Sequence, residues 1–517
     1  MQKLNYKRTI LVGFAFFLIS AFWQAYDATI PVVLTNKFGM SQTWSGLIIA
    51  LDNVLALFML PLFGTLSDKC RTRFGKRTPF ITIGTTIAAV ALIALSFADT
   101  AQLKNISAVS KIDDPAALTT LYETQGDKTL HTPEGEAFVL SEKFTVEEFT
   151  QIRCKTETAS GKLETSQEYT NYVAPARQAY AAEVTTERPG SLVFFVALLL
   201  VLLISMATFR SPAVALMPDV TIKPLRSKAN AIINLMGTAG GILVLVLGIV
   251  FATSAVQNAL MSYTVYYAIV AGLMLVALLI FLATVREPAW SKQMQEDSIR
   301  LGIEETVEDT TVKRGLTKGE KISLILILAS IALWYFGYNA VTSKYAVYAT
   351  NVLDKSYNTT MLLAQAAAII SYLPAGMIAS KIGRKKTILG GVVMLASAFG
   401  VAAFMRSDSP TLLMNAMFIL AGIAWATINV NSFPMVVELC SGSDIGKYTG
   451  YYYTASMAAQ IATPVLSGFL MDKIAHTVLF PYAAIFVALA FVTMFFVKHG
   501  DSKTPEKTGL EALDVDD

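Results

Sequence analysis

The sequence predicts an all-α membrane protein, with twelve transmembrane helices in two pseudo-symmetric six-helix bundles and an extracytoplasmic insertion between helices 3 and 4. Composition predicts the class, because 54% of the 517 residues are hydrophobic, only 15% are charged and the mean hydropathy is +0.52. A polar loop motif that occurs once in each half predicts the two bundles. The net charge of +3 adds little, since the placement of basic residues is what carries information in a membrane protein.

Twelve stretches are long enough to cross a bilayer, which takes about 20 mostly apolar residues. The first follows Lys3, Lys7 and Arg8, as a signal peptide would. Its apolar run is too long for one and no small-residue cleavage site follows, so we expect it to be retained. The twelve stretches lie near residues 9–34, 44–66, 79–98, 190–217, 229–252, 262–285, 321–343, 359–380, 387–405, 411–437, 447–470 and 478–497.

Basic residues gather in the loops on one side of the predicted membrane. Runs at 69–77, 223–228 and 381–386 follow the second, fourth and eighth spans, whereas the opposite short loops hold only isolated basic residues such as Lys37 and Lys344. Because the basic side faces the cytoplasm, both termini are expected there. Of the three cysteines only Cys154 falls on the opposite side, so no disulfide can form there, which suits a bacterial inner membrane.

The two halves carry the same motifs at unequal spacing. The loop GTLSDKCRTRFGKR at 64–77 is echoed by GMIASKIGRKK at 376–386, and MPDV at the end of span four is echoed by VVEL at the end of span ten. In the first half the loop motif and the span-end motif lie much further apart than in the second half. The polar stretch 99–189 accounts for the extra residues. The predicted parts are 1–98 (helices 1–3), 99–189 (insert), 190–285 (helices 4–6), 286–320 (cytoplasmic linker), 321–497 (helices 7–12) and 498–517 (cytoplasmic tail).

The insert holds fifteen acidic and nine basic residues. A solvated acidic cap is the favoured interpretation, because charge-rich segments are usually hydrated surfaces. Capture of a substrate or partner is the alternative.

The loop at 64–77 resembles the loop signature of the major facilitator superfamily. Its extended form, SDKCRTRFGKRTPFI, is similar to the sucrose-transporter-like branch and its neighbours, the glycoside–pentoside–hexuronide:cation symporters. RSPAVALMPDV at 210–220 is similar to the fourth-span motif of that branch. Plant sucrose transporters carry an arginine in this span, and the matching position here is Val214. Arg210 lies one turn earlier on the same face of the helix. The resemblance implies alternating access, in which two bundles rock about a central site lined mainly by spans one, four, seven and ten.

The charges of the loop motif are expected to form a gate on the cytoplasmic side. In the outward-open state, a carboxylate near a helix end can hold that side shut through charge-assisted contacts with surrounding basic residues. The second copy has Ser380 where the first has Asp68, so the aspartate latch is expected in the first half. The alternative is that the basic residues only set the topology. The candidate gating residues are Asp68, Arg71, Arg73, Lys76, Arg77, Asp219, Arg384 and Glu438.

Three charged residues lie at membrane depth and form the candidate cation-coupling site: Asp27, Asp52 and Arg210. A charge in the hydrocarbon layer is costly, so such residues are paired or functional. Two carboxylates and one guanidinium leave a negative charge that a coupling cation could neutralise before the carrier reorients. A permanent salt bridge between Arg210 and one aspartate is the alternative, and Asp52 is the weaker candidate because LDNVLAL begins near the outer edge of its span.

A proton is the expected coupling ion, with Na⁺ as the alternative, and no cofactor or metal site is expected. Sodium needs several oxygen ligands, which Asp27, Thr29, Asp52 and Asn53 could supply in part. Melibiose-type symporters, which the chain resembles, have Asp-Pro in span two where this sequence has Leu60-Pro61. The missing carboxylate lowers the case for sodium.

Aromatic and amide side chains at membrane depth predict a sugar-binding site. Aromatic faces hold the C–H surfaces of a sugar, and planar amides bind its paired hydroxyls. For Asn339 and Asn429, helix–helix packing is an equal alternative. The candidate substrate-binding residues are Trp23, Asn234, Tyr338, Asn339, Gln365, Trp425 and Asn429.

An enzyme is not expected, since the sequence shows no zinc spacing, phosphate-binding loop or Ser-His-Asp arrangement. The first hypothesis is proton-coupled symport of a small glycoside, a disaccharide such as sucrose or maltose, by a monomer in the lipid bilayer without a nucleic-acid partner. The alternatives are an exporter or carrier of another polar solute, and a transport-inactive membrane sensor that uses the 99–189 insert.

Overall fold

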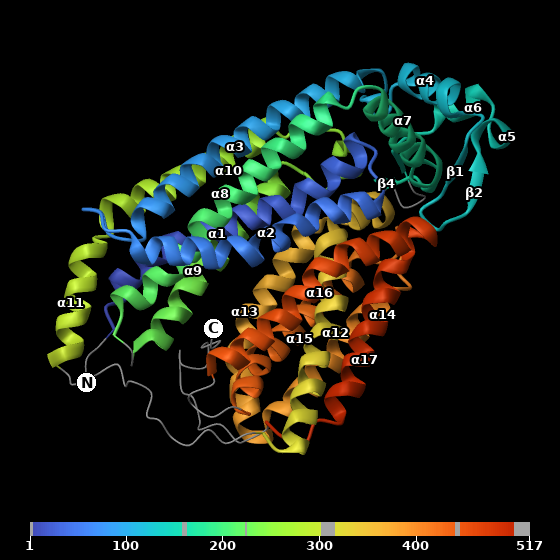
Figure 1. The fold of residues 1–517 in the computed structure, drawn as a ribbon. Helices are drawn as coiled ribbons and strands as arrows, with labels where there is room; N and C mark the ends of the chain where they lie inside the picture. Colours follow the sequence, from blue (N-terminus) through green and yellow to red (C-terminus); the bar gives the residue numbers. More distant parts are fainter. Residues whose placement is uncertain (1–3, 158–162, 223–224, 301–315, 440–444, 501–517) are drawn as a thin grey trace.

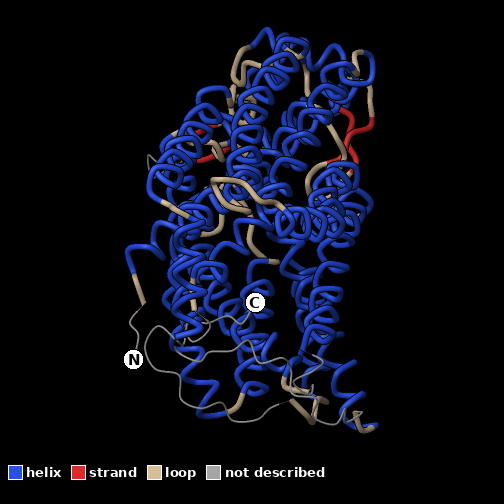
Figure 2. The backbone as a smooth tube through the Cα atoms, turned by 60° about the vertical axis from the view of Figure 1, so that its left-hand side comes forward, coloured by secondary structure: helices blue, strands red, loops and turns tan. Residues whose placement is uncertain are grey.

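The computed structural model describes residues 4–157, 163–222, 225–300, 316–439 and 445–500. Residues 301–315 of the predicted linker, 501–517 of the predicted tail, and Cys440 lie outside the described residues. Figure 2 shows that the described chain is mostly helix and that its strands are confined to the insert.

The first half of the chain forms a bundle of six long helices with a hydrophobic core of its own. The first helix carries Pro31 near its end, and the chain continues as a π-helical turn over Val33–Lys37. The helices are α1 (Tyr6–Val32) with η1 (Val33–Lys37), α2 (Gln42–Lys69), α3 (Thr78–Asn105), α8 (Gly190–Val220), α9 (Arg226–Val250) and α10 (Thr264–Thr284), with the short η5 (Val256–Asn258) before α10.

The second half repeats this arrangement around a second core. Its first helix begins at a capping box, in which Thr317 and Glu320 satisfy each other's backbone donors. The helices are α12 (Lys318–Tyr348) with η6 (Ala349–Leu353), α13 (Tyr357–Ile382), α14 (Arg384–Ala402), α15 (Thr411–Val437), α16 (Ile445–Lys473), η8 (His476–Val478) and α17 (Leu479–Phe495). Figure 1 shows the two bundles side by side, the first in blue to green and the second in yellow to red.

The insert is a small domain with a third hydrophobic core. Its two hairpins are antiparallel, with Leu130 opposite Phe138 and Thr156 opposite Glu164. Its elements are η2 (Ser107–Val109), α4 (Pro115–Gln125), β1 (Thr129–His131), β2 (Ala137–Val139), α5 (Leu140–Lys143), α6 (Val146–Gln151), β3 (Lys155–Glu157), β4 (Leu163–Thr165), η3 (Tyr169–Val173) and α7 (Ala174–Glu187). One further helix, α11 (Glu287–Arg300), follows the first bundle.

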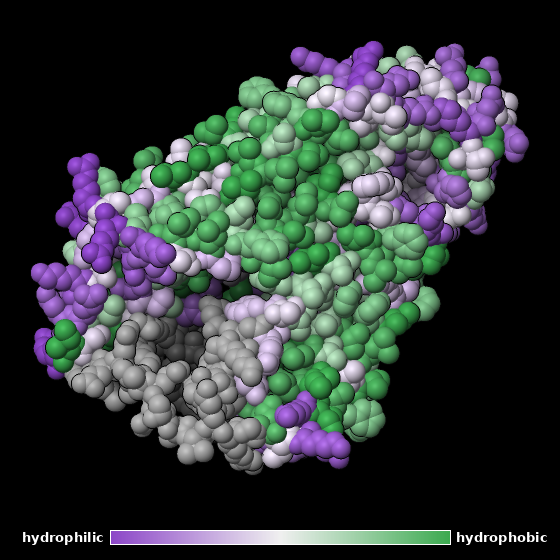
Figure 3. Space-filling model, viewed as in Figure 1, coloured by the Kyte–Doolittle hydropathy of each residue, from purple (hydrophilic) through white to green (hydrophobic). Residues whose placement is uncertain are grey.

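Eleven of the described helices are long and apolar enough to cross a membrane. The twelfth is α13, which has 26 residues, carries polar side chains such as Asn358 and Gln365, and packs against α9 and α15. Figure 3 shows apolar side chains over the flanks of both bundles and polar ones at the insert and at the opposite end. The prediction of a twelve-helix membrane fold is therefore confirmed.

The two ends of the molecule are named here by what they carry: the insert side, and the terminal side, where the described ends of the chain lie (Figure 1). The bundles approach each other toward the insert side and diverge toward the terminal side. Three sequence expectations are wrong in detail. The third span runs on to Asn105, beyond the predicted start of the insert at residue 99. Lys37 and Lys344, predicted to lie in short loops, belong to helices and are fully buried.

Candidate functional site

A cavity of about 440 Å³ lies between the two bundles. Both halves line it, which is the arrangement that the predicted central site requires. Its polar and aromatic lining comes from α1, α8, α9, α12, α13, α14 and α15. These side chains are Ser20, Trp23, Gln24, Asp27, Arg210, Thr238, Tyr338, Thr342, Gln365, Tyr372, Phe399, Phe418 and Trp425.

Two of the three predicted cation-coupling residues, Asp27 and Arg210, line this cavity. Neither takes part in a salt bridge among the described residues, so the permanent ion pair considered as an alternative is not present here. Arg210 instead places its guanidinium carbon 5.7 Å from the ring centroid of Trp23, within cation–π distance. The cavity thus holds one acid and one base that do not neutralise each other by direct contact.

Asp52, the third predicted coupling residue, does not line the cavity. Its Oδ1 accepts hydrogen bonds from the backbone N–H of Asn53 at 2.6 Å and from the Asn53 amide at 2.7 Å. This carboxylate is therefore held by its own helix. The structure thus places Asp27 in the lining of the cavity and Asp52 outside it.

An aromatic wall covers the second-bundle face of the cavity. Tyr338 and Trp425 stack with 3.6 Å between their centroids and 5° between their planes, and Tyr335 meets the Trp425 ring edge-on at 5.3 Å. Stacked rings present a broad, rigid apolar surface with little side-chain freedom left to lose on binding. This wall contains two of the predicted substrate-binding residues.

Two amides from opposite bundles meet across the cavity. Gln365 on α13 donates to Oε1 of Gln24 on α1 at 2.5 Å, and Gln24 donates to the hydroxyl of the buried Tyr357 at 3.3 Å. Gln24 is only 7% exposed. Sequence reasoning identified Gln365 but missed Gln24 and Tyr372. The signal for Gln24 was available, since it is a polar residue next to Trp23 in an apolar span.

The other predicted substrate-binding residues lie outside the cavity lining. Asn234 is exposed on α9, and the Asn339 amide nitrogen is buried with no hydrogen-bond partner among the described residues. Asn429 contacts the hydroxyl of Tyr372 and so lies one contact away from the cavity. Of the seven predicted residues, Trp23, Tyr338, Gln365 and Trp425 line the cavity.

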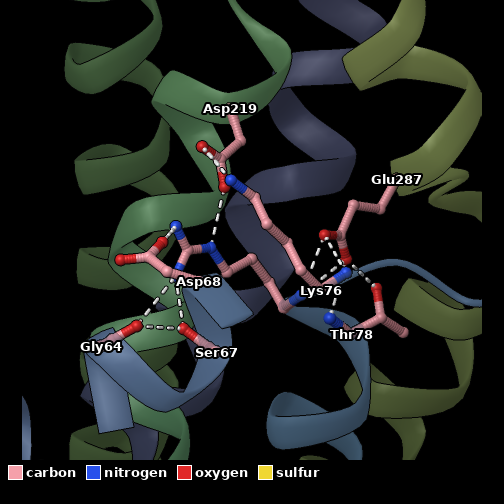
Figure 4. A network of polar contacts seen from close by, with 8 residues as sticks. Gly64, Ser67, Asp68, Lys76, Thr78, Asp219 and Glu287 are labelled. Atoms are coloured by element: carbon pink, nitrogen blue, oxygen red, sulfur yellow. Dashed lines mark hydrogen bonds and ion pairs between the residues drawn. The ribbon is translucent and has the colours of Figure 1, made fainter. Parts of the chain in front are cut away.

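The predicted gating residues of the first half form a polar network on the terminal side (Figure 4). Arg77 at the start of α3 pairs with Asp68 on α2 and donates from Nε to Asp219 on α8 at 2.8 Å. Lys76 reaches the same Asp219 carboxylate at 3.1 Å. Arg71 and Arg73 stay exposed, with Arg73 packed over the ring of Phe74.

The second half repeats the contact. Arg384 at the start of α14 donates to Glu438 at the end of α15 at 2.6 Å. Each network joins helices of a single bundle in this structure. The action of these residues as a latch between the bundles in the outward-open state stays a prediction.

Glu287 is a member of the first network that sequence reasoning missed. This carboxylate is 2% exposed and accepts hydrogen bonds from the backbone N–H groups of Lys76, Arg77 and Thr78 and from the Thr78 hydroxyl, at 2.7–3.1 Å. A carboxylate here satisfies the unpaired donors of the first turn of α3 and complements its dipole. Gly75, with φ +111°, lies so close that an added Cβ would be 2.3 Å from the Glu287 carboxyl carbon.

A buried ion pair near the insert side was also missed, because Lys37 and residue 99 were predicted to lie outside the membrane. Lys37 and Asp99 are 2.5 Å apart and both side chains are fully buried. Lys37 also donates to the carbonyl of Met261 at 2.7 Å and lies 4.3 Å from the ring centroid of Tyr263. The pair ties the ends of α1 and α3 to the start of α10.

Comparisons with known proteins agree with this geometry. Residues 11–105 match the family described as MFS/sugar transport protein, and residues 348–515 match the Major Facilitator Superfamily. Over 140 residues the chain is 28% identical to the MFS-type transporter ppzB of Metarhizium rileyi (strain RCEF 4871), which is 27% of this chain and 28% of that protein. The chain thus aligns with little more than a quarter of that relative's length.

Two solved structures resemble the whole fold. The inward-open conformation of the xylose transporter XylE from E. coli gives a TM-score of 0.58 at 16% identity, covering 98% of this chain and 99% of that one. A mutant form of the nucleoside transporter NupG gives 0.56 at 14% identity, covering 95% and 99%. The chain thus has a multi-pass membrane fold like that of these solved transporters, and its two ends match the models of MFS/sugar transport protein and of the Major Facilitator Superfamily.

Proposed function

We propose that the chain is a secondary active transporter that carries a small glycoside, a disaccharide such as sucrose or maltose, together with a proton by alternating access. One observation carries the proposal. A single cavity between the two bundles holds an acid without an ion-pair partner among the described residues, Asp27, beside a stacked aromatic wall and two amides.

The lining of the cavity supports a sugar-like solute. Its volume of about 440 Å³ lies in the range typical of small-molecule sites. The Tyr338–Trp425 wall can cover the C–H face of a sugar ring, while the Gln24 and Gln365 amides can bind neighbouring hydroxyls. The xylose and nucleoside transporters named above carry solutes that contain a pentose, which is compatible with this class.

The position of Asp27 supports coupling to a cation. A carboxylate can stay ionised while the cavity is open to water, but closure of the bundles around it would leave a bare charge in a poorly solvated site. Proton binding removes that charge. Closing of the bundles around Asp27 therefore requires a proton, and opening to water allows its release.

One oxygen group that could have helped to complete a sodium site has other partners. The Thr29 hydroxyl donates to the Ala25 carbonyl at 2.7 Å and accepts from the Tyr267 hydroxyl at 2.9 Å. Since sodium needs several oxygen ligands around one point, the proton is the favoured ion.

The remaining expectations are part of the same proposal. The terminal side faces the cytoplasm of a bacterium, the insert faces outward, and the transporter works as a monomer in the inner membrane. The concentration of basic loop residues on the terminal side supports this orientation.

Transport by purified protein in proteoliposomes tests the proposal. With an imposed inward proton gradient, the unaltered protein should accumulate labelled sucrose or maltose, and collapse of the gradient by a protonophore should abolish accumulation. Asp27→Asn should still exchange solute across the membrane but not concentrate it, because the neutral amide mimics the protonated acid. Asp408→Asn, at an exposed acid outside the cavity, is the control and should retain accumulation.

Each failure has a distinct meaning. Uphill accumulation by Asp27→Asn would overturn the coupling mechanism. Proton-driven movement out of right-side-out vesicles would indicate an exporter. Absence of transport, together with disaccharide binding by the full-length protein at the insert, would favour the sensor.

A further inference from the structure

The insert is firmly attached to the first bundle. Helix α3 runs without a break from the bundle to Asn105, next to the first element of the insert. At the other end, α7 packs so closely on the α1–α2 turn that a Cβ at Gly39, which has φ +64°, would lie 2.2 Å from the backbone nitrogen of Ala182. Gln102 on α3 donates to the Thr185 hydroxyl of α7 at 2.9 Å. Two covalent connections and these contacts fix the insert on the first bundle.

The tip of the β1–β2 hairpin nevertheless touches the second bundle. The carbonyl of Pro133 accepts a hydrogen bond from the backbone N–H of His476 at 2.8 Å. Gly135, with φ +90°, lies against the connection after α16, where an added Cβ would be 2.2 Å from the carbonyl oxygen of Ile474. Glu134 pairs with Arg406 at 3.2 Å, but both are largely exposed and the pair adds little stability.

A charged clamp lies beside this docking point and joins the two bundles directly. Asp472 at the end of α16 accepts hydrogen bonds from the backbone N–H groups of Gln42 and Thr43, each at 2.7 Å, and from the Thr43 hydroxyl. These are orphan donors at the start of α2, so a carboxylate of one bundle caps a helix of the other. The carboxylate also complements the positive end of the α2 dipole.

Lys344 completes the clamp from α12. Its ammonium group is fully buried and donates to the Gln42 carbonyl at 2.5 Å and to the Ser45 hydroxyl at 2.9 Å. Beside it α2 and α16 are in backbone contact, since a Cβ at Gly46 would be 2.0 Å from the Pro464 carbonyl oxygen. The first turn of α2 is thus held by both a cation and an anion of the second bundle.

We propose that the insert is a strap, and that together with the Asp472–Lys344 clamp it holds the insert side of the transporter closed. Asp472, Ile474 and His476 belong to one short segment that runs from the end of α16 into the connection to α17, so the hairpin and the clamp contact the same part of the second bundle. Because insert and α2 both move with the first bundle, opening the insert side breaks both sets of contacts together.

The strap interface is built to be released. A cavity of about 260 Å³ separates the insert from the second bundle there, and its lining includes His131, Gln178, Asn351, Asp472 and His476. Polar interfaces of this kind between parts of one chain are typical of contacts that break and re-form. The strap therefore lowers the population of the state that is open on the insert side, but it does not prevent that state from forming.

Cysteine accessibility tests the strap. A single cysteine is placed in the central cavity by Ser20→Cys after Cys70, Cys154 and Cys440 are changed to serine. A membrane-impermeant maleimide is then applied from the insert side to right-side-out vesicles, and from the terminal side to inside-out vesicles. The ratio of the two labelling rates reports the balance between the two open states.

Two substitutions loosen the closed state. Gly135→Ala forces a side chain against Ile474 without touching the insert core, and Asp472→Ala removes the cap from α2. Each should raise the insert-side labelling rate, by about threefold to thirtyfold, and lower the terminal-side rate. The matched controls are Gly190→Ala, where a Cβ would meet nothing within 4 Å, and Asp408→Ala, an exposed acid on the same side. Both controls should leave the two rates unchanged.

Opposite changes on the two sides distinguish a shifted equilibrium from misfolding, because an unfolded variant would label faster from both. Unchanged insert-side labelling in both test variants, or an equal rise in the controls, would overturn the strap. The inference rests on alternating access but not on the solute or the coupling ion. A carrier of another solute would give the same labelling result, so failure of the strap and failure of the glycoside assignment are distinguishable.

Discussion

Arg77 donates from its Nε to Asp219 at 2.8 Å and thereby joins the start of α3 to the end of α8. The second bundle repeats the relationship between the start of α14 and the end of α15, where Arg384 meets Glu438 at 2.6 Å. The two pairs sit at the positions that the echo between the halves predicted. Internal symmetry therefore extends from the sequence motifs to their contacts.

Loss of the Glu287 charge should destabilise the first bundle. Glu287→Gln leaves only one acceptor oxygen for the four donors at the start of α3. A hydrogen bond to a charged group contributes about 1.5–3 kcal/mol to the free energy of unfolding, so the variant should lose stability. We expect a lower midpoint of thermal unfolding, measured by loss of the monomer peak in size-exclusion chromatography after heating. Glu296→Gln, at a largely exposed position on the same helix, is the control and should unfold as the unaltered protein does. Equal midpoints for the two variants would contradict the proposed capping role.

The amide pair of the cavity should contribute to solute affinity. Gln24→Ala removes one amide from the cavity and leaves Gln365 without its partner, so the half-saturating solute concentration should rise about tenfold. Concentration-dependent uptake into proteoliposomes measures this. Asn234→Ala is the comparison variant. The sequence predicts Asn234 as a substrate-binding residue, but the structure places it on an exposed face of α9, so this variant should leave the affinity unchanged. An effect of Asn234→Ala as large as that of Gln24→Ala would show that the cavity is not the binding site.

The buried pair of Lys37 and Asp99 should be sensitive to removal of one partner. Asp99→Ala leaves the Lys37 ammonium group without its carboxylate partner in a site with no solvent exposure. This should lower the free energy of unfolding by about 3–5 kcal/mol. The double variant Lys37→Met with Asp99→Leu removes both charges and should recover most of the loss. Thermal midpoints in detergent report both results. If the double variant were no more stable than Asp99→Ala, the loss would have to come from packing and not from the uncompensated charge.

The Cys154 thiol in the insert should not react with maleimide in the folded protein. Burial, reinforced by the charges of Asp113 and Asp354, raises the pKa of its thiol to about 12, so at neutral pH the reactive thiolate is absent. It is also only 1% exposed. In a Cys440→Ser background, a permeant maleimide should modify the partly exposed Cys70 first and Cys154 only after denaturation. Mass spectrometry of the labelled peptides checks the order, and early labelling of Cys154 would show that the insert core opens readily.

Several candidate residues could be identified from the sequence because they belong to strong local patterns. Apolar stretches of membrane length predict the helices, and repeated motifs at helix ends identify Asp219 and Glu438 as candidate gating residues, without predicting their pairing with Arg77 and Arg384. Trp23, Tyr338, Gln365 and Trp425 were found because aromatic and amide side chains are costly in lipid unless they face a partner. The boundary of the insert was misplaced because α3 continues to Asn105 on residues that are more polar but still helical.

By itself the sequence determined the class of this protein, its twelve helices and the doubling of its halves, since these follow from hydropathy and short motifs along the chain. Only the tertiary structure decided that Asp27 faces a shared cavity while Asp52 is held by Asn53, and that Asp472 caps a helix of the other bundle. The rotation of each helix about its axis depends on packing between segments hundreds of residues apart. An apolar helix shows little amphipathic pattern from which that rotation could be read.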